Sequence, residues 1–158
     1  MTDTKPSAKP SSSARTSGNV LSEEERAAMR ETVRERKKAA KLTPEEQRAE
    51  GEADVLAKIA EMAEDDRAIA ARIHELVRAT APDLAPRTFY GMPAYAKDGR
   101  VICFFQAKSK FKVRYSTLGF QPDARLDDEE IWPVAFAVTA LSTAGEKRIA
   151  ELVKKAAG

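Results

Sequence analysis

Residues 88–106 read TFYGMPAYAKDGRVICFFQ, and this stretch decides the fold class. After Pro86 the hydrophobic pattern changes from a helical period to a period of two, which is typical of β-strands. Asp98-Gly99 is a dipeptide favoured in two-residue hairpin turns, so it predicts a hairpin between strands at 94–97 and 101–106. A second turn is expected at Met92-Pro93, after a short strand at 88–91.

Helical patterns flank this region on both sides. The chain predicts further elements as follows: helices at 23–41, from Pro44 onward, at 65–80 and after Thr143, and strands at 111–115 and 132–138. Helices followed by antiparallel hairpins and a closing helix are typical of an α+β fold. We expect an antiparallel meander sheet with helices packed on one face, preceded by a disordered tail and a solvated helix.

Three segments follow from composition. Residues 1–20 are Ser, Thr, Pro, Lys and Ala with almost no large apolar side chain, which predicts a disordered tail. Residues 21–50 form a solvated helical extension, because the helix at 23–41 offers few apolar positions for packing. Residues 51–158 form the α+β domain.

Bulk composition excludes several classes of protein. The chain of 158 residues has 42% hydrophobic and 33% charged residues, a net charge of +2 and one cysteine. An intrachain disulfide is therefore impossible, and no apolar stretch is long enough to span a bilayer or to serve as a secretory signal. We expect a cytoplasmic protein that does not bind membranes. The near-neutral charge also argues against a nucleic-acid partner.

The string Tyr90-Gly91-Met92-Pro93-Ala94-Tyr95 is followed in order by Gly99, 101–105, Leu118-Gly119-Phe120, Leu126-Asp127-Asp128 and Trp132-Pro133. On the strength of these motifs, residues 52–156 resemble the YdhG-like domain family. The chain departs from the family pattern at Phe89, where Trp is frequent, and at Glu129, where Gly is common. The resemblance implies an antiparallel sheet with helices on one side.

One branch of that family is described as a frataxin-like iron chaperone. The resemblance therefore implies a non-enzymatic protein with no tightly bound cofactor, which holds iron weakly and passes it to iron-accepting assembly proteins. Weak, exposed iron binding favours carboxylate oxygens. The candidate metal ligands are Asp127, Asp128, Glu129 and Glu130, and a second acidic group is Glu61, Glu64, Asp65 and Asp66. The alternative is that both groups are solvated or stabilise helix and turn ends.

A small-ligand or nucleic-acid binding module is the alternative function. Lys108, Lys110, Lys112 and Arg114 alternate with other residues, so a strand would carry all four on one basic face. Such a face could contact phosphates, or it could protect a strand edge from aggregation.

An aromatic pocket is the companion hypothesis, since apolar walls with a few polar tips form small-ligand sites. The candidate lining is Tyr90, Met92, Pro93, Tyr95, Phe104 and Trp132. These residues would otherwise belong to the core.

No catalytic motif stands out. His74 is the only histidine and is expected to serve packing, and Cys103 lies in mid-strand as a buried, inert thiol. Neither a nucleophile elbow, nor a phosphate loop, nor a zinc motif is present in the sequence. We therefore expect that the protein is not an enzyme.

Overall fold

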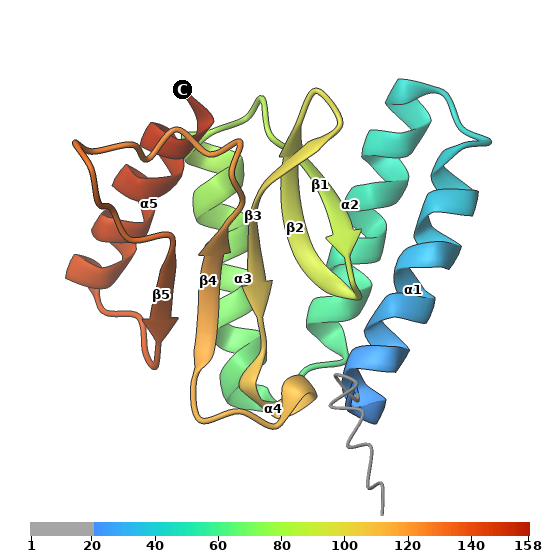
Figure 1. Ribbon diagram of the computed structural model, residues 1–158, viewed down its shortest axis with the longest axis horizontal. Coiled ribbons are helices and arrows are strands. Elements are labelled where there is room, and N and C mark those ends of the chain that lie inside the picture. Colours follow the sequence, from blue (N-terminus) through green and yellow to red (C-terminus); the bar gives the residue numbers. More distant parts are fainter. Residues whose placement is uncertain (1–20) are drawn as a thin grey trace, which may run out of the picture.

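The structure is a computed structural model that describes residues 21–158. The described chain is an α+β fold with a five-stranded antiparallel sheet in the order β1-β2-β3-β4-β5 (Figure 1). Its elements are α1 (Glu23–Ala39), α2 (Pro44–Ala60), α3 (Glu64–Thr80), β1 (Ala85–Phe89), β2 (Met92–Lys97), β3 (Arg100–Gln106), α4 (Lys108–Phe111), β4 (Ser116–Phe120), β5 (Ala135–Val138) and α5 (Thr143–Ala157). The predicted fold class is confirmed; the expected disorder of residues 1–20 lies outside the described residues.

The hairpin at Asp98-Gly99 is confirmed, because both residues have positive φ (51° and 77°) and Lys97 pairs with Arg100. The expected turn at Met92-Pro93 is wrong. The β1–β2 turn lies at Tyr90-Gly91, whose φ values are 50° and 74°. Pro93 is inside β2 and lies just beyond the β2–β3 ladder, which begins at Ala94. A proline fits there because its missing N–H is not needed for that ladder.

The hydrophobic core lies between the sheet and helices α2, α3 and α5, which cover one face (Figure 1). Val55, Ile73 and Val153 from the three helices are at most 1% exposed, as are Phe105 and Leu118 from the sheet. Burial of such apolar side chains is the main stabilising term for a domain of this size.

Gly51 explains how closely α2 approaches the sheet. A Cβ at this position would lie 2.2 Å from the Pro86 carbonyl oxygen, so only glycine lets the helix pack directly on β1. Glycine in the middle of a helix lowers its stability, and here the close approach of α2 to β1 requires it.

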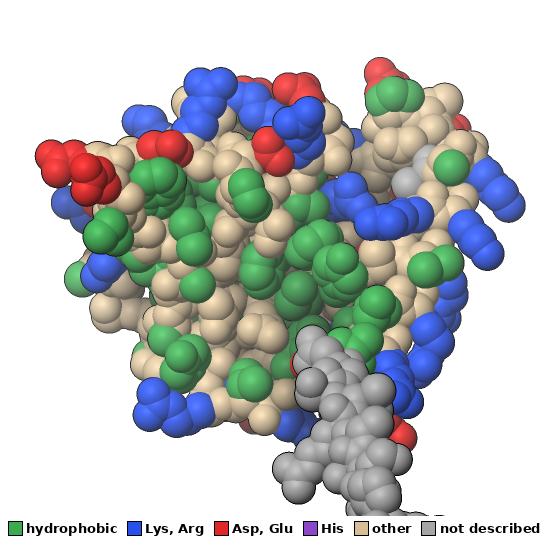
Figure 2. Space-filling model, viewed as in Figure 1, with side chains coloured by type: hydrophobic (Ala, Val, Ile, Leu, Met, Phe, Trp, Pro, Cys, Tyr) green, Lys and Arg blue, Asp and Glu red, His purple; other side chains and the backbone are tan. Residues whose placement is uncertain are grey.

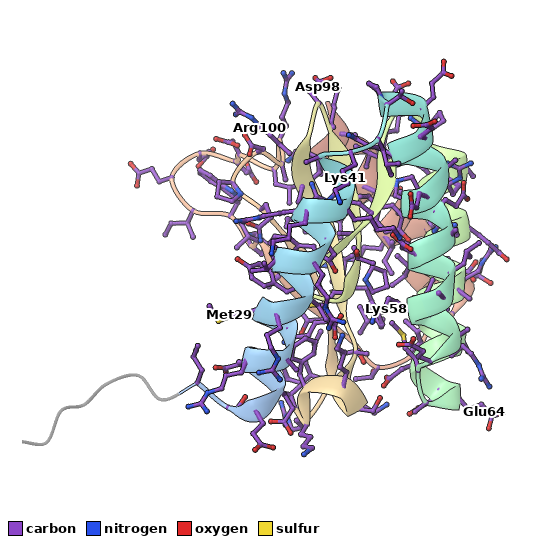
Figure 3. All side chains as sticks on the ribbon, turned by 90° about the vertical axis from the view of Figure 1, so that its right-hand side faces the viewer. Met29, Lys41, Lys58, Glu64, Asp98 and Arg100 are labelled. Carbon is purple, nitrogen blue, oxygen red and sulfur yellow. The ribbon has the colours of Figure 1, made fainter. Side chains whose placement is uncertain are left out.

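Helix α1 lies beside the edge strand β1, on the opposite side from α2 (Figure 3). Ser22 and Glu25 form a capping box at its start. Among the side chains of α1 that the structure describes, Ala28 and Thr32 are buried, and Met29 points away from the sheet, so apolar contact is as limited as the sequence suggests. The polar contacts of this helix, described below, were not predicted.

The expected strand at 111–115 and the basic strand face built on it are wrong. Residues 108–111 form the short helix α4, Lys112 has a left-handed φ of 53°, and β4 begins only at Ser116. The closing helix α5 is confirmed, and the Ser142 hydroxyl caps it by accepting from the Gly145 N–H. Within residues 21–158, every helix is too short or too polar to cross a bilayer.

Candidate functional site

The acidic run Asp127–Glu130 lies exposed in the loop between β4 and β5. Glu129 in this run has a left-handed φ of 54°. No three His, Cys, Asp or Glu side chains within residues 21–158 are grouped so as to hold a metal ion together. The loop therefore presents four separate, hydrated carboxylates.

In the second acidic group, Asp65 and Asp66 pair with Lys108, and Glu61 lies 3.6 Å from Lys58. Asp66 is fully buried and accepts hydrogen bonds from the Ser109 N–H at 3.2 Å and the Ser116 hydroxyl at 2.9 Å. Burial alone would raise the pKa of Asp66, but Ser109, Ser116 and Lys108 outweigh it and hold the pKa low. Asp65 pairs with Lys108 as well. These carboxylates anchor α4 to the start of α3.

The four predicted cations do not share a face. Lys108 pairs with Asp65 and Asp66, and Lys110 donates to the Gly91 carbonyl at 2.9 Å. Lys112 pairs with Glu24 of α1, while the Arg114 guanidinium lies 5.2 Å from the Tyr115 ring centre. Because three of them are already paired, they offer little to phosphates.

Several contacts between α1 and the rest of the domain are ionic. Glu31 of α1 contacts Lys58 Nζ at 3.1 Å and Lys110 Nζ at 3.5 Å. Burial alone would raise the pKa of Glu31, yet these two ammonium groups lower it. Further along the helix, Lys38 pairs with Glu50 and Asp54 of α2.

The predicted aromatic pocket is divided between the two faces of the sheet. Tyr95 is 1% exposed and belongs to the core, whereas Phe104 is outside it and packs its ring over Gly119 on the other face. Phe104 contacts Phe89, which in turn contacts Tyr90, on a surface that is largely hydrophobic at its centre (Figure 2). The remaining candidates are also scattered: Met92 and Pro93 are buried in β2, and Trp132 packs on the core from the β4–β5 loop. These residues do not line one cavity.

His74 and Cys103 are structural, as the sequence suggests. His74 is 7% exposed; its Nδ1 lies 2.9 Å from the Tyr95 hydroxyl and its Nε2 3.3 Å from Glu52. Burial raises the pKa of the Cys103 thiol to about 12, which leaves it protonated and unreactive near neutral pH.

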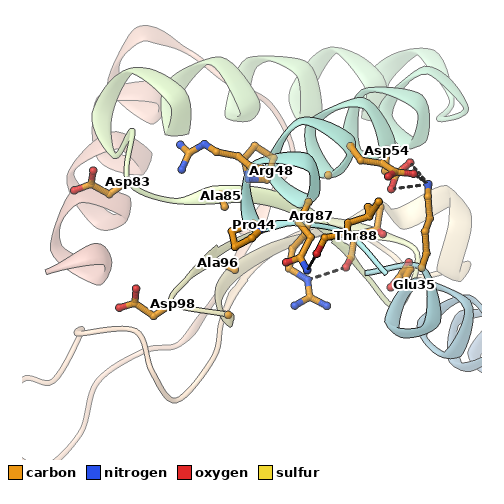
Figure 4. Close-up of a pocket in the computed structure, with 17 residues that line it drawn as sticks. Glu35, Pro44, Arg48, Asp54, Asp83, Ala85, Arg87, Thr88, Ala96 and Asp98 are labelled. Carbon is orange, nitrogen blue, oxygen red and sulfur yellow. Dashed lines mark hydrogen bonds and ion pairs between the residues drawn. The ribbon is translucent and has the colours of Figure 1, made fainter. Parts of the chain in front are cut away.

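A cavity that the sequence did not reveal lies where α1, α2, the edge strand β1 and the β2–β3 turn meet (Figure 4). Its volume is about 330 Å³. Apolar walls come from Leu42, Pro44, Ala85, Pro86 and Ala96. The cavity lies between α1 and α2 at the edge of the sheet. Because its lining comes from segments far apart in the sequence, no short sequence motif predicts it.

Arg87 is the central charged group of this cavity. It is half-buried on β1, and its Nε donates to the Thr88 carbonyl at 3.3 Å. No carboxylate within residues 21–158 forms an ion pair with Arg87. The signal in the sequence was a lone arginine inside a strand of otherwise uncharged residues, directly after Pro86.

Glu35 stands at one side of the cavity. Its Oε1 accepts from the Gly91 N–H at 3.3 Å, and its Oε2 is buried without a hydrogen-bond partner among the described residues. Burial raises the pKa of Glu35, and the Thr88 side chain, the Gly91 N–H and Arg87 offset that effect only in part. A half-buried carboxyl group with a raised pKa, beside an unpaired arginine, is typical of binding sites.

Asp83 and Asp98 lie at the opposite end of the cavity, with Arg48 and Arg87 between them and Glu35 (Figure 4). The Arg48 guanidinium donates to the Pro82 carbonyl and has no ion pair within the described residues. The cavity thus has a cationic centre between acidic groups at both ends. Comparison with family models, with curated proteins and with solved structures gives no significant match for this chain.

Proposed function

We propose that this protein is a non-enzymatic binding protein that takes up a small dipolar molecule in the cavity between α1, α2 and β1. The observation that carries the proposal is Arg87, a half-buried guanidinium that lines the cavity and has no ion pair within residues 21–158. A half-buried cation without a counter-charge is unfavourable, and an anionic group of a ligand relieves it.

The dimensions and walls suit a small metabolite. A volume of about 330 Å³ is within the range of small-molecule sites. The apolar wall residues Leu42, Pro44 and Ala96 supply contact area, and a few charged groups supply orientation.

The arrangement of charges selects a ligand with both signs. Arg87 and Arg48 favour a carboxylate, sulfonate or phosphate, which accepts several N–H bonds from a guanidinium. Asp83 and Asp98 favour an ammonium group at the other end of the same cavity. A purely anionic ligand interacts favourably only with the two arginines, and a purely cationic ligand only with the two aspartates.

Binding fits the cavity better than catalysis does. Its lining contains no Ser, Cys, His or Tyr, its one lysine, Lys38, is already paired with Glu50 and Asp54, and Thr88 is buried. Nucleophilic catalysis needs such a side chain beside a free base.

A thermal-shift screen tests the proposal with three matched sets of probes. These are zwitterions such as glycine, taurine and betaine, anions such as acetate and phosphate, and cations such as ethanolamine. A ligand at 100 times its Kd stabilises the folded state by about 2.7 kcal/mol, which raises Tm measurably. We expect zwitterions to act most strongly and Arg87→Gln to abolish the shift, while Arg114→Gln leaves it unchanged. A shift that Arg87→Gln retains contradicts the proposal.

Iron binding is a second candidate function, implied by the resemblance to the YdhG-like family. The observation that favours it is the exposure of Asp127, Asp128, Glu129 and Glu130, since a carrier must release its iron to an acceptor. In this account the iron is cargo and would retain much of its water. Its test is independent of the cavity and is given in the Discussion.

A further inference from the structure

The two edges of the sheet are treated differently. Strand β1 is covered by α1 and α2, and it contains Pro86 and Arg87, two residues that discourage strand addition. Strand β5 pairs only with β4, so its outer edge has no strand partner among the described residues, and the Arg148 guanidinium of α5 lies 5.8 Å from its Phe136 ring centre. One edge is therefore protected and the other is open.

The open edge presents unpaired backbone groups. The Phe120 N–H donates to the Val134 carbonyl at 2.8 Å, so residue 134 is directed toward β4. The backbone N–H and C=O groups of successive residues point to alternate sides of a strand. Phe136 and Val138 therefore also bond to β4, whereas the N–H and C=O groups of Ala135 and Ala137 point outward.

No charge guards this edge. Residues 131–145 contain no Asp, Glu, Lys or Arg. Ile131 is 88% exposed and Val134 is 48% exposed at the start of the stretch. Edge strands of monomeric proteins normally carry a lysine, a proline or a bulge, because an uncharged edge pairs with other strands. Between Ala135 and Val138, β5 has none of these, and Pro133 lies before the strand.

We propose that β5 is the pairing edge of a symmetric dimer, in which a second copy of this chain adds its own β5 in antiparallel orientation. Pairing Phe136 with Phe136 of the second copy places Ala135 opposite Ala137 of that copy, and the reverse. The outward groups of Ala135 and Ala137 then bond to one another, and every side chain stays on its own face of the sheet.

The second copy is the occupant that the observations favour. It supplies an equally uncharged strand in matching register, so no charge is desolvated. The pairing also ends after two copies, because the other edge of each sheet is covered by α1 and α2. A continuous ten-stranded sheet results, and fibre growth is avoided.

A charge-swap experiment tests this dimer. Ala135 and Ala137 are both exposed, so charged side chains there are compatible with the folded monomer. The double variant Ala135→Glu/Ala137→Glu places like charges opposite each other across the dyad, as does Ala135→Lys/Ala137→Lys. We expect the parent chain to approach twice the monomer mass as its concentration rises in sedimentation equilibrium, each double variant to remain monomeric, and an equimolar mixture of the two to dimerise again.

Amide hydrogen exchange gives a second readout at single-residue resolution. In the dimer the Ala135 and Ala137 amides are protected to a degree that rises with protein concentration, whereas Phe136 and Val138 are protected at all concentrations. Ala68→Glu, at an exposed position of α3, is the control and should dimerise like the parent. A parent chain that stays monomeric, a double variant that dimerises alone, or a mixture that fails to associate overturns the proposal.

Discussion

The backbone N–H of Ser109 donates to the buried carboxylate of Asp66 at 3.2 Å, across 43 residues of sequence. The same carboxylate accepts from the Ser116 hydroxyl and pairs with Lys108. Asp66 thus fixes both ends of the segment 108–116, and the chain turns through a short helix instead of continuing as a strand. One buried acid decides the conformation of the segment in which the sequence pattern predicted a basic strand.

Replacing Asp66 by Asn should therefore destabilise the fold. The amide keeps one acceptor oxygen and turns the other position into a donor, which leaves buried partners unsatisfied; such a loss costs about 1–3 kcal/mol. Chemical denaturation should show a lower midpoint with an unchanged slope. Asp65→Asn is the control, because Asp65 is 64% exposed, and it should change the midpoint little. Equal effects of the two substitutions would contradict the anchoring role of Asp66.

The same residue predicts a pH dependence. The pKa of Asp66 is lowered in the folded protein relative to its ordinary value of about 3.9. A depressed carboxyl pKa contributes stability that is complete above the unfolded-state pKa and is lost as the pH falls through the folded-state pKa. The stability difference between the parent and Asp66→Asn should therefore be constant near neutral pH and shrink below about pH 4. If the stability difference persists below about pH 4, the Asn substitution destabilises the fold through altered hydrogen bonding and packing, and not through the lost charge of Asp66.

The sequence predicted the fold class because the local signals and the tertiary structure agree at the decisive places. The hairpin at Asp98-Gly99 needs two residues with positive φ, and the helix caps at Ser22 and Thr43 act within one turn. The turn at Tyr90-Gly91 was wrongly predicted at Met92-Pro93, because proline is a strong turn signal. Pro93 instead lies in β2, just before the residues of β2 that pair with β3. Period-two spacing failed at 108–114, because Asp66 is distant in sequence.

The candidate site was much less predictable. The cavity gathers residues from α1, α2, β1 and the β2–β3 turn, and no spacing rule connects Glu35 with Arg87. The predicted aromatic pocket does not form, because the side chains of Tyr95 and Phe104 lie on opposite faces of the sheet. Only the lone charge of Arg87 in a strand offered a local signal.

Docking of α1 should depend on charge. Glu31→Gln leaves Lys58 and Lys110 without their shared carboxylate, and we expect a loss of about 1 kcal/mol in unfolding free energy at low salt. Screening should shrink that loss between about 0.1 M and about 1 M salt. Glu61→Gln, whose carboxylate is 68% exposed and 3.6 Å from Lys58, is the matched control. A loss that does not depend on salt would mean that α1 is held by packing of Ala28 and Thr32.

Glu129→Gly should stabilise the protein. Glu129 has a φ of 54°, a conformation that costs an L-residue energy but suits glycine. The gain, after the added entropy of the unfolded chain, should be about 0.5–1 kcal/mol and should appear as a higher Tm. Glu130→Gly changes a neighbouring exposed residue without positive φ and should give no gain. If both variants melt at the same temperature, backbone strain at Glu129 is not relieved by glycine.

Iron binding is tested by anaerobic titration with ferrous iron. If the β4–β5 loop carries iron, changing Asp127, Asp128, Glu129 and Glu130 together to their amides should reduce binding at least severalfold without altering the far-ultraviolet circular dichroism. Glu45→Gln/Glu151→Gln, which removes two exposed carboxylates outside both acidic groups, should leave binding unchanged. A parent chain that binds no ferrous iron removes this function from consideration.

Chemical-shift mapping tests the proposed cavity most directly. Titrating the ¹⁵N-labelled parent with the zwitterion that raises Tm most should shift the amide signals of Gly51, Thr88 and Ala96, which line the cavity. The signals of the distant loop at 127–130 should stay in place, and Arg87→Gln should shift none of them at the same ligand concentration. Shifts confined to residues outside the cavity, or equal shifts in Arg87→Gln, would contradict the binding function assigned to it.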